Sequence, residues 1–124
     1  MNTIATLFLL AFFLPVVAAG IAKAGGQGFD NASPRDWLSQ QKGYRARANA
    51  AQKNIFEGLP FFFAAALFAL HNQVDLGDLR NMMAAWIILR LVYVGCYVAN
   101  VSLLRTAVWS LSVAVNIYML YMAI

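Results

Sequence analysis

Charged residues are scarce in this chain, and their scarcity argues against an ordinary soluble domain. They make up 11% of the 124 residues, whereas the hydrophobic set makes up 62%; soluble domains carry about 25% charged residues. Residues 1–22 and 106–124 contain no Asp, Glu, Lys or Arg. An apolar run of about 18 residues or more is long enough to cross the hydrocarbon core of a bilayer. The sequence therefore predicts an all-α integral membrane protein with one domain over residues 1–124.

Cysteine is nearly absent as well. Cys96 is the only one, which excludes an internal disulfide and a cysteine-based metal site, and we expect no metal. The surroundings of Cys96 are apolar, so a small buried side chain is predicted there. The net charge of +4 does not indicate nucleic acid as a partner, because the basic residues cluster between apolar runs. That placement is typical of membrane topology, with the lipid bilayer as the partner.

Four spans are predicted from the apolar runs. They are residues 2–22, 45–71, 81–101 and 106–122. The glycine-rich residues 25–28 indicate a loop, and a short amphipathic helix is predicted over residues 34–42, with Ser33 as N-cap and Asp36 as the reciprocal capping acid. A cleaved signal peptide is the alternative interpretation of the first run, but no Lys or Arg precedes that run and it is longer than a usual signal core.

The placement of lysine and arginine predicts the orientation in the membrane. The first connection, the start of the second span and the third connection together hold most of these residues, namely Lys23, Arg35, Lys42, Arg45, Arg47, Lys53 and Arg105. The second connection holds only Arg80, with two aspartates beside it. Since cytoplasmic loops are enriched in Lys and Arg, the first and third connections are expected in the cytoplasm and both termini outside.

Two polar residues interrupt the second span. Asn54 and Glu57 are three residues apart and therefore share a helix face, on which Arg47 lies two turns earlier. Polar groups within a bilayer are energetically costly and are usually functional. A glutamate near the hydrocarbon boundary must be paired, hydrogen-bonded or protonated. Two interpretations stay open: a structural ion pair with a neighbouring helix, and a ligand site that also requires the pair.

The third span carries a polar stripe of its own. Arg90, Tyr93 and Tyr97 are spaced by three and then four residues, which places them on one face of a helix. Arg90 must face a protein interior or a wet cavity rather than lipid, so it is the predicted partner of Glu57. An interfacial aromatic belt is the alternative for the tyrosines. Arg105, just before the last span, is a topology marker unless it faces the same cavity as Tyr97.

These motifs together resemble the MAPEG family, the membrane-associated proteins of eicosanoid and glutathione metabolism. The second-span sequence Asn54-Ile55-Phe56-Glu57-Gly58-Leu59-Pro60 is similar to the family signature of Asn, two residues, Glu, two residues and Pro before an apolar run. The series Arg90, Tyr93, Tyr97 and Arg105 resembles the later family motif. Chain length, four spans and a long first connection agree, so the resemblance covers nearly the whole chain.

The resemblance implies a left-handed four-helix bundle in each subunit of a homotrimer. It implies glutathione as co-substrate, bound between adjacent subunits near the cytoplasmic side of a bacterial inner membrane. Asn54 and Glu57 would hold its polar groups, with Glu57 on the ammonium, and Arg90, Tyr93 and Tyr97 would line the same interface. Arg105 would be the catalytic residue, because a fixed cation favours the thiolate. The implied activity is that of a transferase or peroxidase acting on an apolar electrophile.

One position departs from the family pattern. Active members usually have Arg four residues before the Asn, where this chain has Ala50. Arg47, a turn earlier, is the candidate substitute in the glutathione site. Arg45 competes in a second register with Asn49 and Gln52, but that register misplaces the proline.

Two other functions remain as alternatives. One is a non-catalytic membrane protein of this type, in which Glu57 and Arg90 form a structural strut between subunits. The other is a small proton-coupled transporter. Tiny four-span exporters carry their acidic residue in the first helix, and here the first span has no charge, which disfavours a transporter.

Overall fold

The computed structural model describes residues 1–124 as five helices without a strand. Their bounds are α1 (Asn2–Lys23), α2 (Pro34–Ser39), α3 (Tyr44–His71), α4 (Leu76–Val98) and α5 (Ser102–Tyr121). All except α2 are long and apolar enough to cross a membrane. The structure thus confirms the prediction of an all-helical chain with four membrane-spanning segments.

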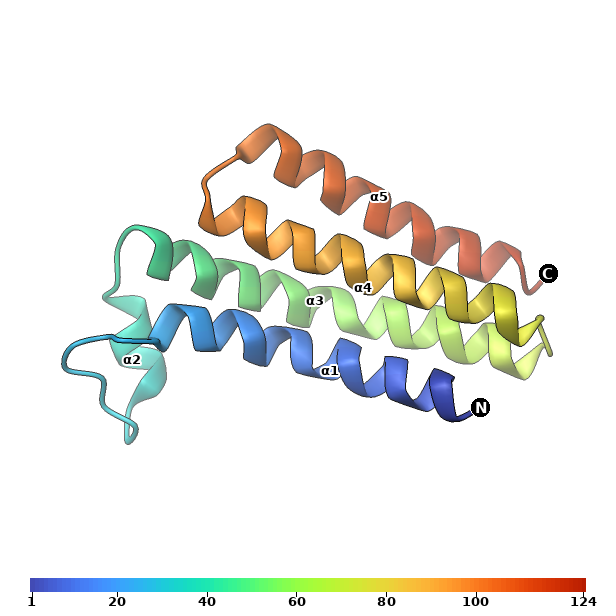
Figure 1. The fold of residues 1–124 in the computed structure, drawn as a ribbon, viewed down its shortest axis with the longest axis horizontal. Helices are drawn as coiled ribbons and strands as arrows, with labels where there is room; N and C mark the ends of the chain where they lie inside the picture. Colours follow the sequence, from blue (N-terminus) through green and yellow to red (C-terminus); the bar gives the residue numbers. More distant parts are fainter.

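The four long helices run up and down beside one another (Figure 1). Helices α3 and α4 form the centre of the bundle, because each of them contacts both α1 and α5. Both termini and the α3–α4 connection lie at one end, whereas α2 and the α4–α5 connection lie at the other. All of the nine lysines and arginines except Arg80 and Arg90 lie toward the end with α2, which we call the basic end.

Helix starts differ from the sequence-based expectations. Helix α4 begins at Leu76, before the expected residue 81, because Asp75 caps it: Asp75 Oδ1 accepts the backbone N–H groups of Gly77 at 2.9 Å and Asp78 at 3.0 Å. Helix α5 begins at Ser102 rather than at residue 106.

The short helix α2 also departs from its prediction. It ends at Ser39 rather than at residue 42. Ser33 is its N-cap and Pro34 follows, but Ser33 makes no side-chain cap bond, so the predicted capping box with Asp36 is wrong. The Ser33 carbonyl instead accepts the backbone N–H of Trp37 at 3.2 Å, which closes the first turn through the backbone alone.

The surface of the bundle is apolar between its ends. Only 30 of the 124 residues are buried, and side chains such as Leu9, Ile88 and Leu103 are 60%, 60% and 84% exposed. An apolar surface of this extent is suited to lipid rather than to water. The interior of α1 and α3 is rich in fully buried alanines, among them Ala11, Ala18 and Ala65, and small residues let membrane helices approach closely.

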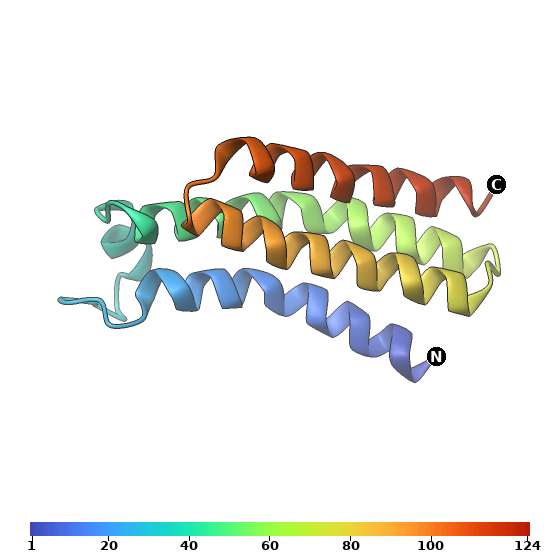
Figure 2. The same ribbon diagram turned by 45° about the horizontal axis from the view of Figure 1, so that its top comes forward.

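Helix α1 follows its neighbours over only part of its length. Figure 2 shows α1 beside α4 toward the C-terminal end of α1 and turning away from it toward the N-terminus. Pro15 lies inside this helix and is buried. A proline removes one backbone N–H donor and is a usual cause of a bend in a helix. Polar residues of α3, α4 and α5, such as Asn54, Arg90 and Asn116, lie between these three helices and away from α1.

Candidate functional site

Arg90 is a charged residue buried in the middle of the bundle. Its side chain is 2% exposed and lies between α3, α4 and α5. Arg90 Nη2 donates to Asn54 Oδ1 at 2.7 Å, and Nη1 makes a long contact of 3.5 Å with Ser112 Oγ. The guanidinium also lies over the ring of Tyr93, 4.5 Å from its centroid. Arg90 therefore faces the protein interior, as the sequence predicted.

The predicted ion pair between Arg90 and Glu57 is not formed. Arg90 donates its hydrogen bonds to Asn54 and Ser112 instead. Asn54, one turn before Glu57 on the same helix, reaches the guanidinium with a neutral oxygen, while Glu57 is exposed. Glu57 nevertheless lines the same pocket as Arg90. The carboxylate is therefore left available to a cationic group from outside the chain.

This pocket has a volume of about 300 Å³ and lies between α3, α4 and α5. Two buried polar atoms in its lining residues have no partner within the chain: Arg90 Nε, a donor, and Asn116 Oδ1, an acceptor. Buried polar groups are nearly always hydrogen-bonded, to protein, water or ligand. A free donor and a free acceptor beside one polar pocket indicate that it holds water or the polar groups of a ligand.

Arg90, Tyr93, Tyr97 and Arg105 form a continuous series of contacts. Tyr93 and Tyr97 meet edge to face, with ring centroids 5.6 Å apart and an interplanar angle of 80°. The Arg105 guanidinium lies 4.4 Å from the centroid of the Tyr97 ring. Each tyrosine thus carries a cation on its face, which is a favourable arrangement for both partners. The series connects the buried Arg90 with Arg105 at the basic end.

A second pocket of about 180 Å³ lies next to the first. It is lined by Asn54, Tyr93, Arg105, Thr106 and Trp109, and it shares Asn54 and Trp109 with the Arg90 pocket. We call these two pockets together the polar site. The structure therefore brings Asn54, Glu57, Arg90, Tyr93 and Arg105 to two neighbouring pockets, with Tyr97 in contact with two of these residues.

Arg47 lies outside the polar site. Its Nε and Nη2 atoms donate to the Val98 carbonyl at 3.2 and 2.9 Å, at the C-terminal end of α4. Arg45 does the same for α1, donating from Nη1 to the Ala22 carbonyl at 2.9 Å. The last carbonyls of a helix have no partner within it, and an arginine there also complements the helix dipole. Both arginines therefore join α3 to the ends of neighbouring helices.

Arg47→Ala is expected to lower the free energy of unfolding by about 2 kcal/mol, because hydrogen bonds from a charged donor contribute about 1.5–3 kcal/mol each. The measurement is unfolding of the detergent-solubilised protein. Lys42→Ala is the control, since it removes an exposed cation from the same end of the bundle and is expected to change stability by less than about 0.5 kcal/mol. Equal stabilities of the two variants would contradict the assignment of Arg47 to the end of α4.

Sequence reasoning missed the contribution of α5 to the polar site. Ser112 and Asn116 are 1% and 3% exposed. Ser112 Oγ donates to the Trp109 carbonyl at 2.7 Å while facing Arg90. The sequence did indicate it, since Ser112 and Asn116 are two polar residues four positions apart on one face of a predicted span, residues 106–122, that has no charged residue.

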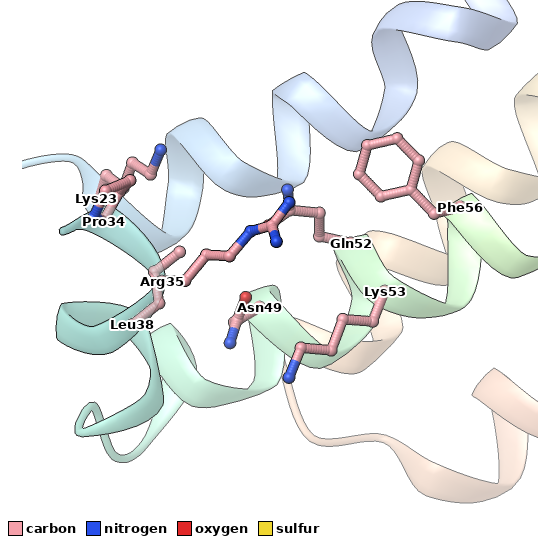
Figure 3. A pocket seen from close by; sticks show the side chains of 8 residues that line it. All are labelled: Lys23, Pro34, Arg35, Leu38, Asn49, Gln52, Lys53 and Phe56. Carbon is pink, nitrogen blue, oxygen red and sulfur yellow. The ribbon is translucent and has the colours of Figure 1, made fainter. Parts of the chain in front are cut away.

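A third pocket, separate from the polar site, lies at the basic end on another face of α3. Figure 3 shows it between the end of α1, helix α2 and α3. It has a volume of about 390 Å³, and its lining includes Lys23, Arg35, Asn49, Gln52, Lys53 and Phe56. The sequence indicated Asn49 and Gln52 only as an alternative register for the motif at Asn54. We call it the basic pocket.

The chain is similar to one known protein family over nearly its whole length. The model of the MAPEG family matches residues 3–124, which is nearly the whole chain. The comparison with curated proteins finds no match.

Proposed function

The chain belongs to the MAPEG family, and on that premise we propose that it binds glutathione in the polar site and activates its thiol as a transferase or peroxidase. The supporting observation is that two groups of opposite charge line two neighbouring pockets. Glu57, an unpaired carboxylate, and Arg105, a cation held over Tyr97, line the two pockets that share Asn54 and Trp109. Glutathione carries an ammonium at one end and a thiol at its centre, which requires this order of charges.

Each residue then has a distinct role. The Glu57 carboxylate accepts charge-assisted hydrogen bonds that the ammonium of glutathione donates. Arg90, through its free Nε, and Asn54 face the peptide portion, with Tyr93 and Tyr97 as walls. Arg105 stabilises the thiolate, because a nearby cation favours that form of a thiol. The proposed set omits Arg47, whose guanidinium is bonded to Val98.

The second substrate is proposed to enter from the lipid. Trp109 borders both pockets and is 42% exposed on the apolar surface of the bundle. In a transferase reaction, the thiolate forms a C–S bond with an electrophilic carbon, and the leaving group departs with the electron pair. In a peroxidase reaction, two glutathione molecules form one disulfide and supply the electrons and protons that reduce a hydroperoxide to an alcohol and water.

The assembly and location follow from the same proposal. A homotrimer of left-handed bundles would close the polar site, because Glu57 and Trp109 are exposed in the single chain. The basic end faces the cytoplasm of a bacterial inner membrane under the positive-inside rule. Arg105 and Tyr97 then lie toward the side where glutathione is available.

A non-catalytic role is the second candidate. Ala50 stands where the family's active members usually have Arg, and Arg47 is engaged at the end of α4 rather than in its place. In that case Asn54 and Arg90 serve packing alone, and glutathione has no effect on the protein.

A thermal-shift assay with glutathione tests the proposal. The unfolding temperature of the detergent-purified protein is expected to rise with glutathione concentration, since a ligand of the folded state alone raises apparent stability. Arg105→Ala should retain the shift but lose the ultraviolet absorbance of the bound thiolate. Absence of both a shift and a calorimetric signal at millimolar glutathione would favour the non-catalytic candidate.

A further inference from the structure

We propose that the basic pocket binds the phosphate of an anionic phospholipid headgroup. This site is separate from the polar site, and the inference does not depend on glutathione binding. It rests on the charge of the pocket, on the unused hydrogen-bonding groups in its lining and on its position along α3.

Three cations from three helices surround this space. Lys23 is the last residue of α1, Arg35 lies on α2 and Lys53 lies on α3. No Asp or Glu lines the pocket. Like charges around one cavity of about 390 Å³ repel one another unless an anion lies between them. The volume is within the range of about 300–1,000 Å³ that is typical of small-molecule sites.

The side chains of this pocket are free to bind a ligand. Arg45 and Arg47, on the same helix as Lys53, are bonded to backbone carbonyls. Arg35 and Lys53, in contrast, are exposed and make no side-chain hydrogen bond or ion pair within the chain. The Lys23 ammonium lies 5.4 Å from the centroid of the Phe29 ring, a contact that leaves its hydrogen-bond donors unused. Figure 3 shows the Arg35 side chain extending from α2 toward Gln52 on α3. A guanidinium binds phosphate oxygens in a bidentate manner, a lysine acts as a point charge, and the amides of Asn49 and Gln52 add donors.

The position of the pocket selects a lipid over a soluble phosphate. Asn49 and Phe56 both line it and are seven residues apart along α3, so Phe56 lies about 10 Å deeper into the bundle. Phe56 is 49% exposed and adjoins the apolar half of α3. The pocket is thus polar toward the basic end and apolar toward the membrane interior. A phospholipid has this order of groups, and basic pockets between helices at the cytoplasmic face bind anionic headgroups.

Lipid binding to the intact, detergent-purified protein tests this inference. Native mass spectrometry with phosphatidylglycerol is expected to show affinity at least tenfold higher than with phosphatidylcholine. Each of Arg35→Gln and Lys53→Gln should weaken phosphatidylglycerol binding about fivefold, and the double variant about 25-fold. Lys42→Gln is the matched control, because it removes an exposed cation from the same end without lining the pocket, and it should leave the affinity unchanged.

Competition separates a lipid from other anions. Inorganic phosphate and glycerol phosphate at millimolar concentration should not displace phosphatidylglycerol, and full displacement would overturn the inference in favour of a soluble ligand. The double variant should keep the glutathione-induced thermal shift of the unchanged protein. If the double variant lost the thermal shift but kept its lipid affinity, the basic pocket would be assigned to glutathione and the inference would be overturned. If the protein without substitutions did not respond to glutathione at all, the proposed function would fail but the lipid inference would stand. Equal effects of Lys42→Gln and Lys53→Gln would also overturn it.

Discussion

Asn54→Leu is expected to lower the free energy of unfolding by about 3 kcal/mol, because it leaves the buried charge of Arg90 without its short hydrogen bond. Asn54 Oδ1 accepts from Arg90 Nη2 at 2.7 Å, and the only other side-chain contact of the guanidinium with an oxygen is at 3.5 Å. Reversible unfolding in mixed micelles, without glutathione, measures the loss. Asn49 on the same helix makes no side-chain hydrogen bond to an arginine, so Asn49→Leu should change stability by less than about 0.5 kcal/mol.

A second substitution shows that the charge is the cause. Adding Arg90→Met to Asn54→Leu removes the unsatisfied guanidinium, and the double variant is expected to recover to within about 1 kcal/mol of the unchanged protein. Ser112 keeps its own hydrogen bond to the Trp109 carbonyl, so it is not left unpaired. If the double variant were as unstable as Asn54→Leu alone, the loss would come from packing around residue 54 rather than from the buried charge.

The expected recovery bears on why Arg90 is present. A buried arginine without a carboxylate partner contributes little to stability, and a charged residue within a membrane span is usually functional. Arg90 has a free Nε and lines the pocket, and on this ground we propose that it serves ligand binding, which an apolar residue could not do. Stability of the double variant together with loss of glutathione binding would demonstrate that division between folding and function.

Glu57→Gln is expected to weaken glutathione binding at least tenfold, with little effect on stability. A hydrogen bond to a charged group contributes about 1.5–3 kcal/mol, which corresponds to a factor of about 10 or more in affinity. Glu57 is exposed and is not hydrogen-bonded to Arg90, so its replacement leaves the bundle unchanged. Isothermal calorimetry of the detergent-purified protein provides the affinities.

A glutathione analogue without the α-amino group is the control for Glu57. The unchanged protein and Glu57→Gln should bind this analogue with equal affinity, because the proposed contact is to the ammonium. Size-exclusion chromatography of both proteins should give the same oligomer. A broken oligomer in Glu57→Gln, with no response to glutathione in the unchanged protein, would instead identify Glu57 as a strut between subunits.

Much of the polar site was predictable because helical spacing is regular. The intervals within Asn54–Glu57 and within Arg90–Tyr93–Tyr97 placed these residues on two faces of two helices. The need to keep Arg90 away from lipid then turned its face inward. Its partner was not predictable, because Asn54 and Glu57 share one face and differ by about one turn. Their depth relative to Arg90 depends on how far α3 and α4 are shifted along each other, and that shift is set by packing such as the stacking of Phe62 on Trp86 at 4.1 Å.

The sequence by itself determined that this protein has four membrane spans, a basic end and polar residues on the second and third spans. It did so because scarcity of charge, the length of apolar runs and helical periodicity are properties of the chain alone. Only the tertiary structure decided that Arg90 bonds Asn54 and Ser112, that Arg47 caps α4, and that Lys23, Arg35 and Lys53 surround one pocket. Those contacts join residues far apart in the chain, and their geometry arises from the packing of whole helices.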